Sequence, residues 1–159
     1  MVGYEGYEAY KEDQDDMRQD FAAQQEDLLE ELSDIGSNFD VFAHLKEVAE
    51  LFPNFDKACV GAEGVDELEE ATVEGDPDIH LKMWMHNGGV EFSAVTERKP
   101  VQGILYFIYD LFSGVAPAEV ANAEVFFVDE VAVIGIAPQR IEAAKRAVAL
   151  VQDYARRHA

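Results

Sequence analysis

The stretch HLKMWMHNGGVEFSAV, residues 80–95, decides the fold. Asn87, Gly88 and Gly89 at its centre predict a tight hairpin turn, because Asn and Gly accept the positive φ angles that such turns require. Before and after the turn every second residue is apolar: Leu81, Met83 and Met85, then Val90, Phe92 and Ala94. This alternation is typical of half-buried strands. The stretch therefore predicts two antiparallel strands, over 80–86 and 90–95.

The residues before the hairpin predict two helices and one further strand. Phe21, Leu28, Leu32 and Ile35 follow helical spacing, and Gly36 ends that helix. Asn38 or Asp40 is expected to cap the second helix, which Pro53 ends. In chain order we expect a loose acidic tail over 1–15, helices over 21–35 and 38–52, a loop over 53–67 and a weak strand over 70–74.

The residues after the hairpin predict helices. Pro100 suits the first turn of a helix, where its missing amide hydrogen costs nothing. Apolar residues then recur at helical spacing: Val101, Ile104, Leu105, Ile108, Leu111 and Phe112. Short helices should begin at Pro117 and cover 125–131, and Pro138 should open the last one, with Ile141, Ala144, Val148, Val151 and Ala155 on one side. The sequence thus predicts an α+β domain over 16–159, with a small antiparallel sheet of about three strands packed against a mainly helical C-terminal half.

Composition limits the partners of the chain. Its 159 residues suit one domain, and 33 acidic against 12 basic residues give a formal charge of −21. Nucleic acid and anionic membrane surfaces require a basic footprint, so neither is expected as a partner. No apolar run is long enough to span a bilayer and the first residues do not form a signal peptide, so we expect a cytoplasmic protein.

The charge is concentrated in the first half. Residues 1–75 carry 22 acids and 4 bases, whereas residues 76–159 carry 11 acids and 8 bases. Adaptation to high salt and an acidic face for a basic partner both account for such an excess.

Local motifs predict neither a metal site nor a cofactor. The four histidines are never three or four residues apart, and phosphate-binding and serine-hydrolase motifs are missing. Cys59, the only cysteine, excludes an internal disulfide and a multi-cysteine zinc site. Lys57 lies close to it in sequence and would favour the reactive thiolate. Cys59 is therefore either a reactive thiol or a small apolar residue.

Several segments in order resemble the SufE family, the sulfur acceptors of cysteine desulfurases in iron–sulfur cluster assembly. Residues 101–105 are similar to the family's V-[KR]-G-[LI]-[IL] helix start. Residues 109–119 are similar to its Y-S-G-x-[TS]-P-x-E turn, residues 123–131 to the segment that follows, and residues 135–140 to its L-[ST]-P-[ST]-R motif. The resemblance implies a SufE/NifU-like fold and a cysteine desulfurase or an iron–sulfur scaffold protein as partner.

The resemblance also identifies a site, and the chain departs from the family there. Counting back from Gly103 aligns Gly75 with the glycine before the acceptor cysteine, and Asp76 with that cysteine. Glu97 corresponds to an aspartate of the family, and Arg140 to its arginine. A carboxylate cannot carry persulfide sulfur, which requires a polarizable thiolate.

Two functional expectations follow from the resemblance and this departure. The first is an accessory protein, rather than an enzyme, that binds a desulfurase or scaffold without carrying sulfur. The second is an active carrier that uses Cys59 as the acceptor. At the site itself, Asp76 either forms a charge-assisted contact with Arg140 or caps a turn before Pro77 and faces water.

Overall fold

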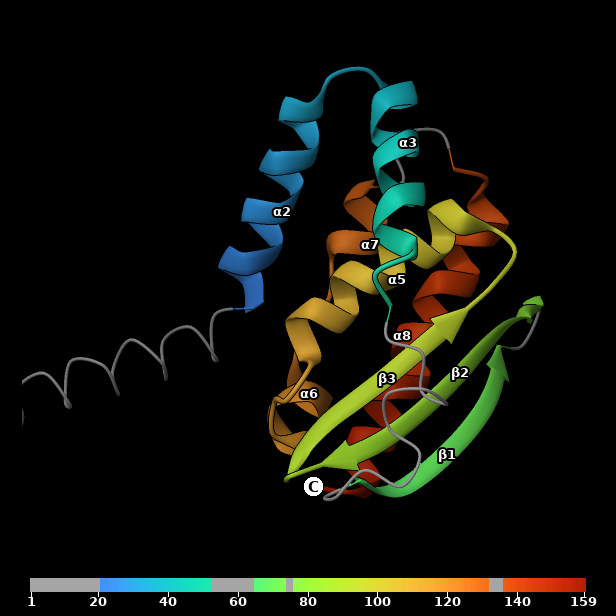
Figure 1. Cartoon of the computed structure of the whole chain (residues 1–159). Coiled ribbons are helices and arrows are strands. Elements are labelled where there is room, and N and C mark those ends of the chain that lie inside the picture. Colours follow the sequence, from blue (N-terminus) through green and yellow to red (C-terminus); the bar gives the residue numbers. More distant parts are fainter. Residues whose placement is uncertain (1–20, 53–64, 74–75, 132–135) are drawn as a thin grey trace, which may run out of the picture.

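A computed structural model describes residues 21–52, 65–73, 76–131 and 136–159 of the chain (Figure 1). Three strands form one antiparallel sheet in the order β1-β2-β3. They are β1 (Val65–Val73), β2 (Asp76–His86) and β3 (Gly89–Val95). The described helices are α2 (Phe21–Ile35), α3 (Asn38–Ala49), α5 (Lys99–Phe112), α6 (Pro117–Asn122), α7 (Phe127–Val131) and α8 (Pro138–Arg157). The predicted α+β class is confirmed.

The central hairpin forms as predicted. His86 pairs with Gly89, and the two residues between them turn the chain with positive φ angles, +50° at Asn87 and +83° at Gly88. Val90 also forms an isolated bridge with Val115, so the chain after α5 covers part of the free edge of β3.

Strand β1 differs from its prediction. It runs from Val65 to Val73, whereas the sequence predicted a strand over 70–74 only. The first three residues of the strand were assigned to the expected loop over 53–67. A bulge between Asp66 and Glu69, with a φ angle of +57° at Glu67, interrupts the register. Exposed acidic residues and this bulge remove the regular alternation that would have revealed the strand.

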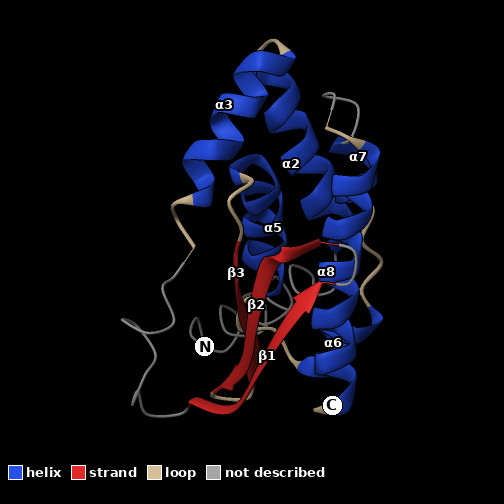
Figure 2. Ribbon diagram, turned by 90° about the vertical axis from the view of Figure 1, so that its right-hand side faces the viewer, coloured by secondary structure: helices blue, strands red, loops and turns tan. Residues whose placement is uncertain are grey.

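The helices cover one face of the sheet, as Figure 2 shows. That face carries fully buried side chains from the two hairpin strands, namely Leu81, Met83, Phe92 and Ala94. The opposite face of β2 carries His80, Lys82 and Trp84. Trp84 belongs to that face by register and is nevertheless only 2% exposed, which the alternation did not predict.

The predicted apolar faces of α5 and α8 are buried throughout. Helix α3 packs so closely on α5 that a Cβ atom at Gly103 would lie 2.7 Å from the carbonyl carbon of Leu45. A glycine is therefore required at this crossing.

Some helix ends differ from the expected ones. Ser37, and not Asn38 or Asp40, caps α3: its hydroxyl accepts a hydrogen bond from the Asp40 amide, and the Asp40 carboxylate accepts one from the Ser37 amide. Helix α3 ends at Ala49 rather than residue 52, and α7 begins at Phe127 rather than residue 125. Ser37, Asn38 and Asp40 are all residue types that cap helices, so the sequence alone does not identify which of them is the N-cap.

The expected tail over 1–15 lies outside the described residues. Among the helices that are described, none is both long enough and apolar enough to cross a bilayer.

Candidate functional site

The expected site is at the end of the sheet where β2 begins. Asp76 is the first residue of β2 and is paired with Val73 of β1. The Asp76 side chain is not among those that the structure describes. Gly75 and Cys59 also lie outside the described residues. The contact between Asp76 and Arg140 therefore stays a prediction.

Glu97 lies at this same end. His80 pairs with Val95, the last residue of β3, so the chain leaves β3 at the end of the sheet where β2 begins. Glu97 is the second residue after β3, and its side chain is exposed.

Buried Gln102 holds the segment that carries Glu97. The Gln102 side-chain oxygen accepts hydrogen bonds from the Thr96 amide (3.0 Å) and from Lys99 Nζ (3.3 Å). Its side-chain nitrogen donates to the carbonyl of Ala49 at the end of α3 (2.8 Å). One side chain thus connects the end of β3, the start of α5 and the end of α3, and it fixes the backbone around Glu97.

Arg140 is an exposed residue in the first turn of α8. The C-terminal end of this helix contacts β1, because Arg157 forms an ion pair with Glu69. A helix of 20 residues is about 30 Å long, so its first turn lies far from that contact. Figure 1 shows the start of α8 toward the side where β3 ends. Among the described side chains, neither Glu97 nor Arg140 has an ion-pair partner, so both charges are available to a binding partner.

A hollow of about 490 Å³ lies beside β1 and β2 near this end. Glu70, Thr72, His80 and Lys82 provide its polar lining, and Lys82 Nζ lies 3.7 Å from a carboxylate oxygen of Glu70. The lining residues of β1 lie within the predicted strand over 70–74, but the sequence did not predict how that strand pairs with β2, so the hollow was missed. The polar residues of this hollow alternate along β2 with the buried Leu81 and Met83, so they lie on the face of the sheet that the helices leave open.

A second polar group connects β3 to the end of α5. The Ser113 hydroxyl lies 2.8 Å from both carboxylate oxygens of Glu91. Burial raises the pKa of Glu91 above its ordinary value, and burial likewise raises the pKa of Tyr109 beside it. Ser113 is the C-cap of α5. A serine bonded directly to a carboxyl group, without an imidazole between them, lacks the arrangement of an activated nucleophile.

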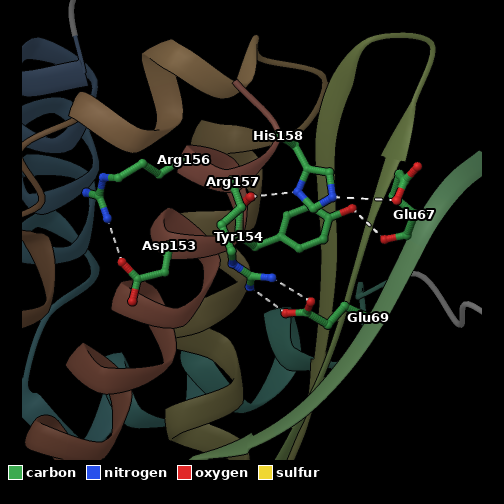
Figure 3. Close-up of polar contacts among 7 residues, drawn as sticks. All are labelled: Glu67, Glu69, Asp153, Tyr154, Arg156, Arg157 and His158. Atoms are coloured by element: carbon green, nitrogen blue, oxygen red, sulfur yellow. Dashed lines mark hydrogen bonds and ion pairs between the residues drawn. The ribbon is translucent and has the colours of Figure 1, made fainter.

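A third group lies at the opposite end of the sheet and joins α8 to the bulge of β1 (Figure 3). The Tyr154 hydroxyl donates to the Glu67 carbonyl oxygen at 2.7 Å, and the His158 ring stacks on Tyr154 with 4.2 Å between centroids. Arg157 donates two hydrogen bonds to the Glu69 carboxylate, 2.8 and 2.6 Å long, which lower the pKa of Glu69. The C-terminal residues of this group are more than 80 positions away from the β1 residues that they contact. No local sequence pattern could therefore have revealed the group.

No group of three or more His, Cys, Asp or Glu side chains within the described ranges could hold a metal ion. Of the expected site residues, Glu97 and Arg140 are exposed charged side chains, and the resemblance implies that Asp76 lies near them. Such an arrangement can bind a partner through charge complementarity.

Comparisons with known proteins identify the fold. No family model matches the chain. No curated protein matches it either. A solution structure described as a hypothetical protein from Thermus thermophilus is similar, with a TM-score of 0.61 and 19% sequence identity. The alignment covers 84% of this chain and 94% of that one. At this identity the likeness shows a shared fold alone.

Proposed function

We propose that this chain is a SufE-like accessory protein that binds a cysteine desulfurase, or an iron–sulfur scaffold protein, without carrying sulfur itself. The observation that carries the proposal is Asp76 at the start of β2 in an otherwise fully packed domain. The resemblance expects the sulfur-accepting cysteine at this position. A carboxylate at this position cannot accept persulfide sulfur, whereas the surrounding surface of the folded domain can still bind a partner.

The exposed charges of Glu97 and Arg140 support a binding role. Glu97 lies in the short connection between β3 and α5, which Gln102 holds in place, and Arg140 lies in the first turn of α8. Neither is neutralised by a described neighbour. Charged side chains of this kind set the specificity and rate of association more than the affinity.

The binding test uses the whole chain and a purified cysteine desulfurase, with affinity measured by calorimetry from about 0.15 M to 2 M KCl. We expect Arg140→Glu to weaken binding about tenfold, because it reverses a charge inside the interface. Lys46→Glu, on the exposed side of α3, makes the same change in net charge and should alter affinity less than about twofold. Absence of binding at every salt concentration would contradict the proposal, as would equal effects of the two variants.

The transfer test separates a non-carrier from a carrier that uses Cys59. After incubation with desulfurase and cysteine, intact-mass analysis should find no added sulfur atom on the wild-type chain. An adduct that disappears in Cys59→Ser would establish the alternative function. In Asp76→Cys, the introduced thiolate would attack the outer sulfur of the enzyme's persulfide and release the enzyme's own thiolate. A sulfur adduct on that variant would show that the rest of the acceptor site persists.

A further inference from the structure

A hollow of about 300 Å³ lies between the start of α2 and the α6–α7 connection, away from the site described above. Two phenyl rings and two alanine residues contribute apolar lining, and two acids and one asparagine supply polar groups. The lining residues are Phe21, Ala22, Glu119, Asn122, Ala123, Glu124 and Phe126. Its volume is at the small end of the range for ligand pockets and suits one side chain or a small molecule.

Glu119 is the unusual member of this lining. One of its carboxylate oxygens is screened from water and has no hydrogen-bond partner among the described residues. No described Lys, Arg or His forms an ion pair with Glu119. A partly desolvated carboxylate without a counter-charge is unfavourable, and an unsatisfied group of this kind calls for an explanation.

Two glutamines fix the wall of the hollow. From α2, the Gln25 side chain donates to the Glu124 carbonyl oxygen (2.9 Å) and accepts from the amides of Phe126 (2.9 Å) and Phe127 (3.0 Å). From α8, the Gln152 side chain donates to the carbonyl oxygens of Val120 (3.1 Å) and Ala123 (2.8 Å). The α6–α7 connection is thus held from both sides, so the hollow is formed before any ligand arrives.

This network also limits the class of ligand. Three carbonyl oxygens near the hollow already accept hydrogen bonds from the glutamines, which leaves few oxygen ligands for a metal ion. Beside two aromatic rings, a carboxylate without a counter-charge among the described residues favours an organic cation, because negative charge and aromatic rings both attract cations. The apolar lining favours an aliphatic chain behind the cationic head.

We propose that this hollow binds an alkylammonium or guanidinium group on an aliphatic chain, with the Glu119 carboxylate as its counter-charge and Phe21 and Phe126 as its apolar walls. The group can belong to a free aliphatic amine or to a lysine or arginine side chain of another protein. Both sources supply the same chemistry.

The test titrates the isotope-labelled full chain with spermidine and, separately, with N-acetyl-lysine methylamide, and follows backbone amides by NMR. N-acetyl-norleucine methylamide is the probe without charge. Shift changes should concentrate at Phe21, Ala123 and Phe126 for the charged probes. The uncharged probe should bind at least about tenfold more weakly. The tighter of the two charged probes identifies the source of the cation.

Variants separate a built site from general attraction to an acidic protein. We expect Glu119→Gln to lower the affinity for the charged probes about tenfold. The same variant should keep or raise the melting temperature of the protein, because it removes a partly buried charge that has no described partner. Glu47→Gln, on the exposed side of α3, removes the same charge elsewhere and should change affinity less than about twofold. Three results would overturn the proposal: no binding of either charged probe, equal weakening by both variants, or a Glu119→Gln chain that melts lower and binds unchanged.

Discussion

Tyr154 fixes the one non-glycine residue of β1 that has a positive φ angle. Its hydroxyl donates to the carbonyl oxygen of Glu67, where φ is +57°. Burial, and then the carboxylates of Glu67 and Glu69, raise the pKa of Tyr154 to about 12. The folded state therefore favours the neutral phenol, which is the form that can donate this hydrogen bond.

The pH dependence of stability should reveal this bond. A pKa raised on folding means that the contribution of Tyr154 is complete below its ordinary value of 10 and is lost as pH rises toward 12. We expect Tyr154→Phe to lower the free energy of unfolding by about 1 kcal/mol at pH 8, and to reduce the further loss between pH 10 and 12. Urea denaturation over this pH range measures both. Tyr106→Phe is the control, and an alkaline loss of the same size in wild type and Tyr154→Phe would refute the assignment.

Gln25 shows what sequence reading misses at the scale of one residue. The apolar residues Phe21, Leu28 and Leu32 predicted the helix correctly, yet the polar Gln25 on the same helix is fully buried. Its side chain makes hydrogen bonds to residues about 100 positions away. A buried polar residue is satisfied by the folded surroundings, and a helical pattern contains no information about those partners.

Among the elements, α3 and α5 cross at Gly103, where a side chain has no room. We expect Gly103→Ala to lower the free energy of unfolding by about 2 kcal/mol, because overlap with the Leu45 carbonyl group outweighs the higher helix propensity of alanine. Gly88→Ala is the comparison: a Cβ there meets no atom within 4 Å, and only the φ angle of +83° opposes it. That variant should lose about 1 kcal/mol. A Gly103→Ala chain as stable as wild type would show that the two helices separate at no cost.

The elements that the sequence predicted well have a regular hydrophobic period. Helices α5 and α8 and the β2–β3 hairpin follow periods of 3.6 and 2, since each has a buried side and an exposed side. Strand β1 has no such period, because it carries acidic residues on its exposed positions and a bulge at Glu67. Antiparallel pairing places the end of β3, two residues before Glu97, at the end of the sheet where β2 begins, whereas the position of Arg140 depends on how α8 packs, which no local pattern encodes.

At the scale of the whole molecule, acidic side chains far outnumber their possible partners. The chain has 33 acidic and 12 basic residues, an excess of 21 acids. Several described ion pairs lie on the C-terminal helix, including Arg157 with Glu69 and Lys145 with Asp129. The helices α2 and α3 carry many acids and, between them, one lysine, Lys46. Repulsion among these carboxylates opposes the folded state, in which they are held closest together.

Salt should therefore stabilise this protein. The screening length falls from about 10 Å at 0.1 M to about 3 Å at 1 M ionic strength, so repulsion between neighbouring carboxylates weakens. We expect the melting temperature to rise by several degrees between 0.1 and 1 M NaCl and then to level off, equally in KCl. A continued linear rise in sulfate alone would indicate exclusion of salt from the surface instead.

A variant with four exposed acids of α2 and α3 replaced by glutamine, at Glu26, Glu30, Glu31 and Glu47, tests the origin of this response. It should melt higher than wild type at 0.1 M NaCl and gain less from added salt, because part of the repulsion has been removed. It should also keep its affinity for a desulfurase if the acidic surface serves solubility in salt, and lose affinity if that surface receives a basic partner. An unchanged salt response would show that the excess charge on these two helices does not limit stability.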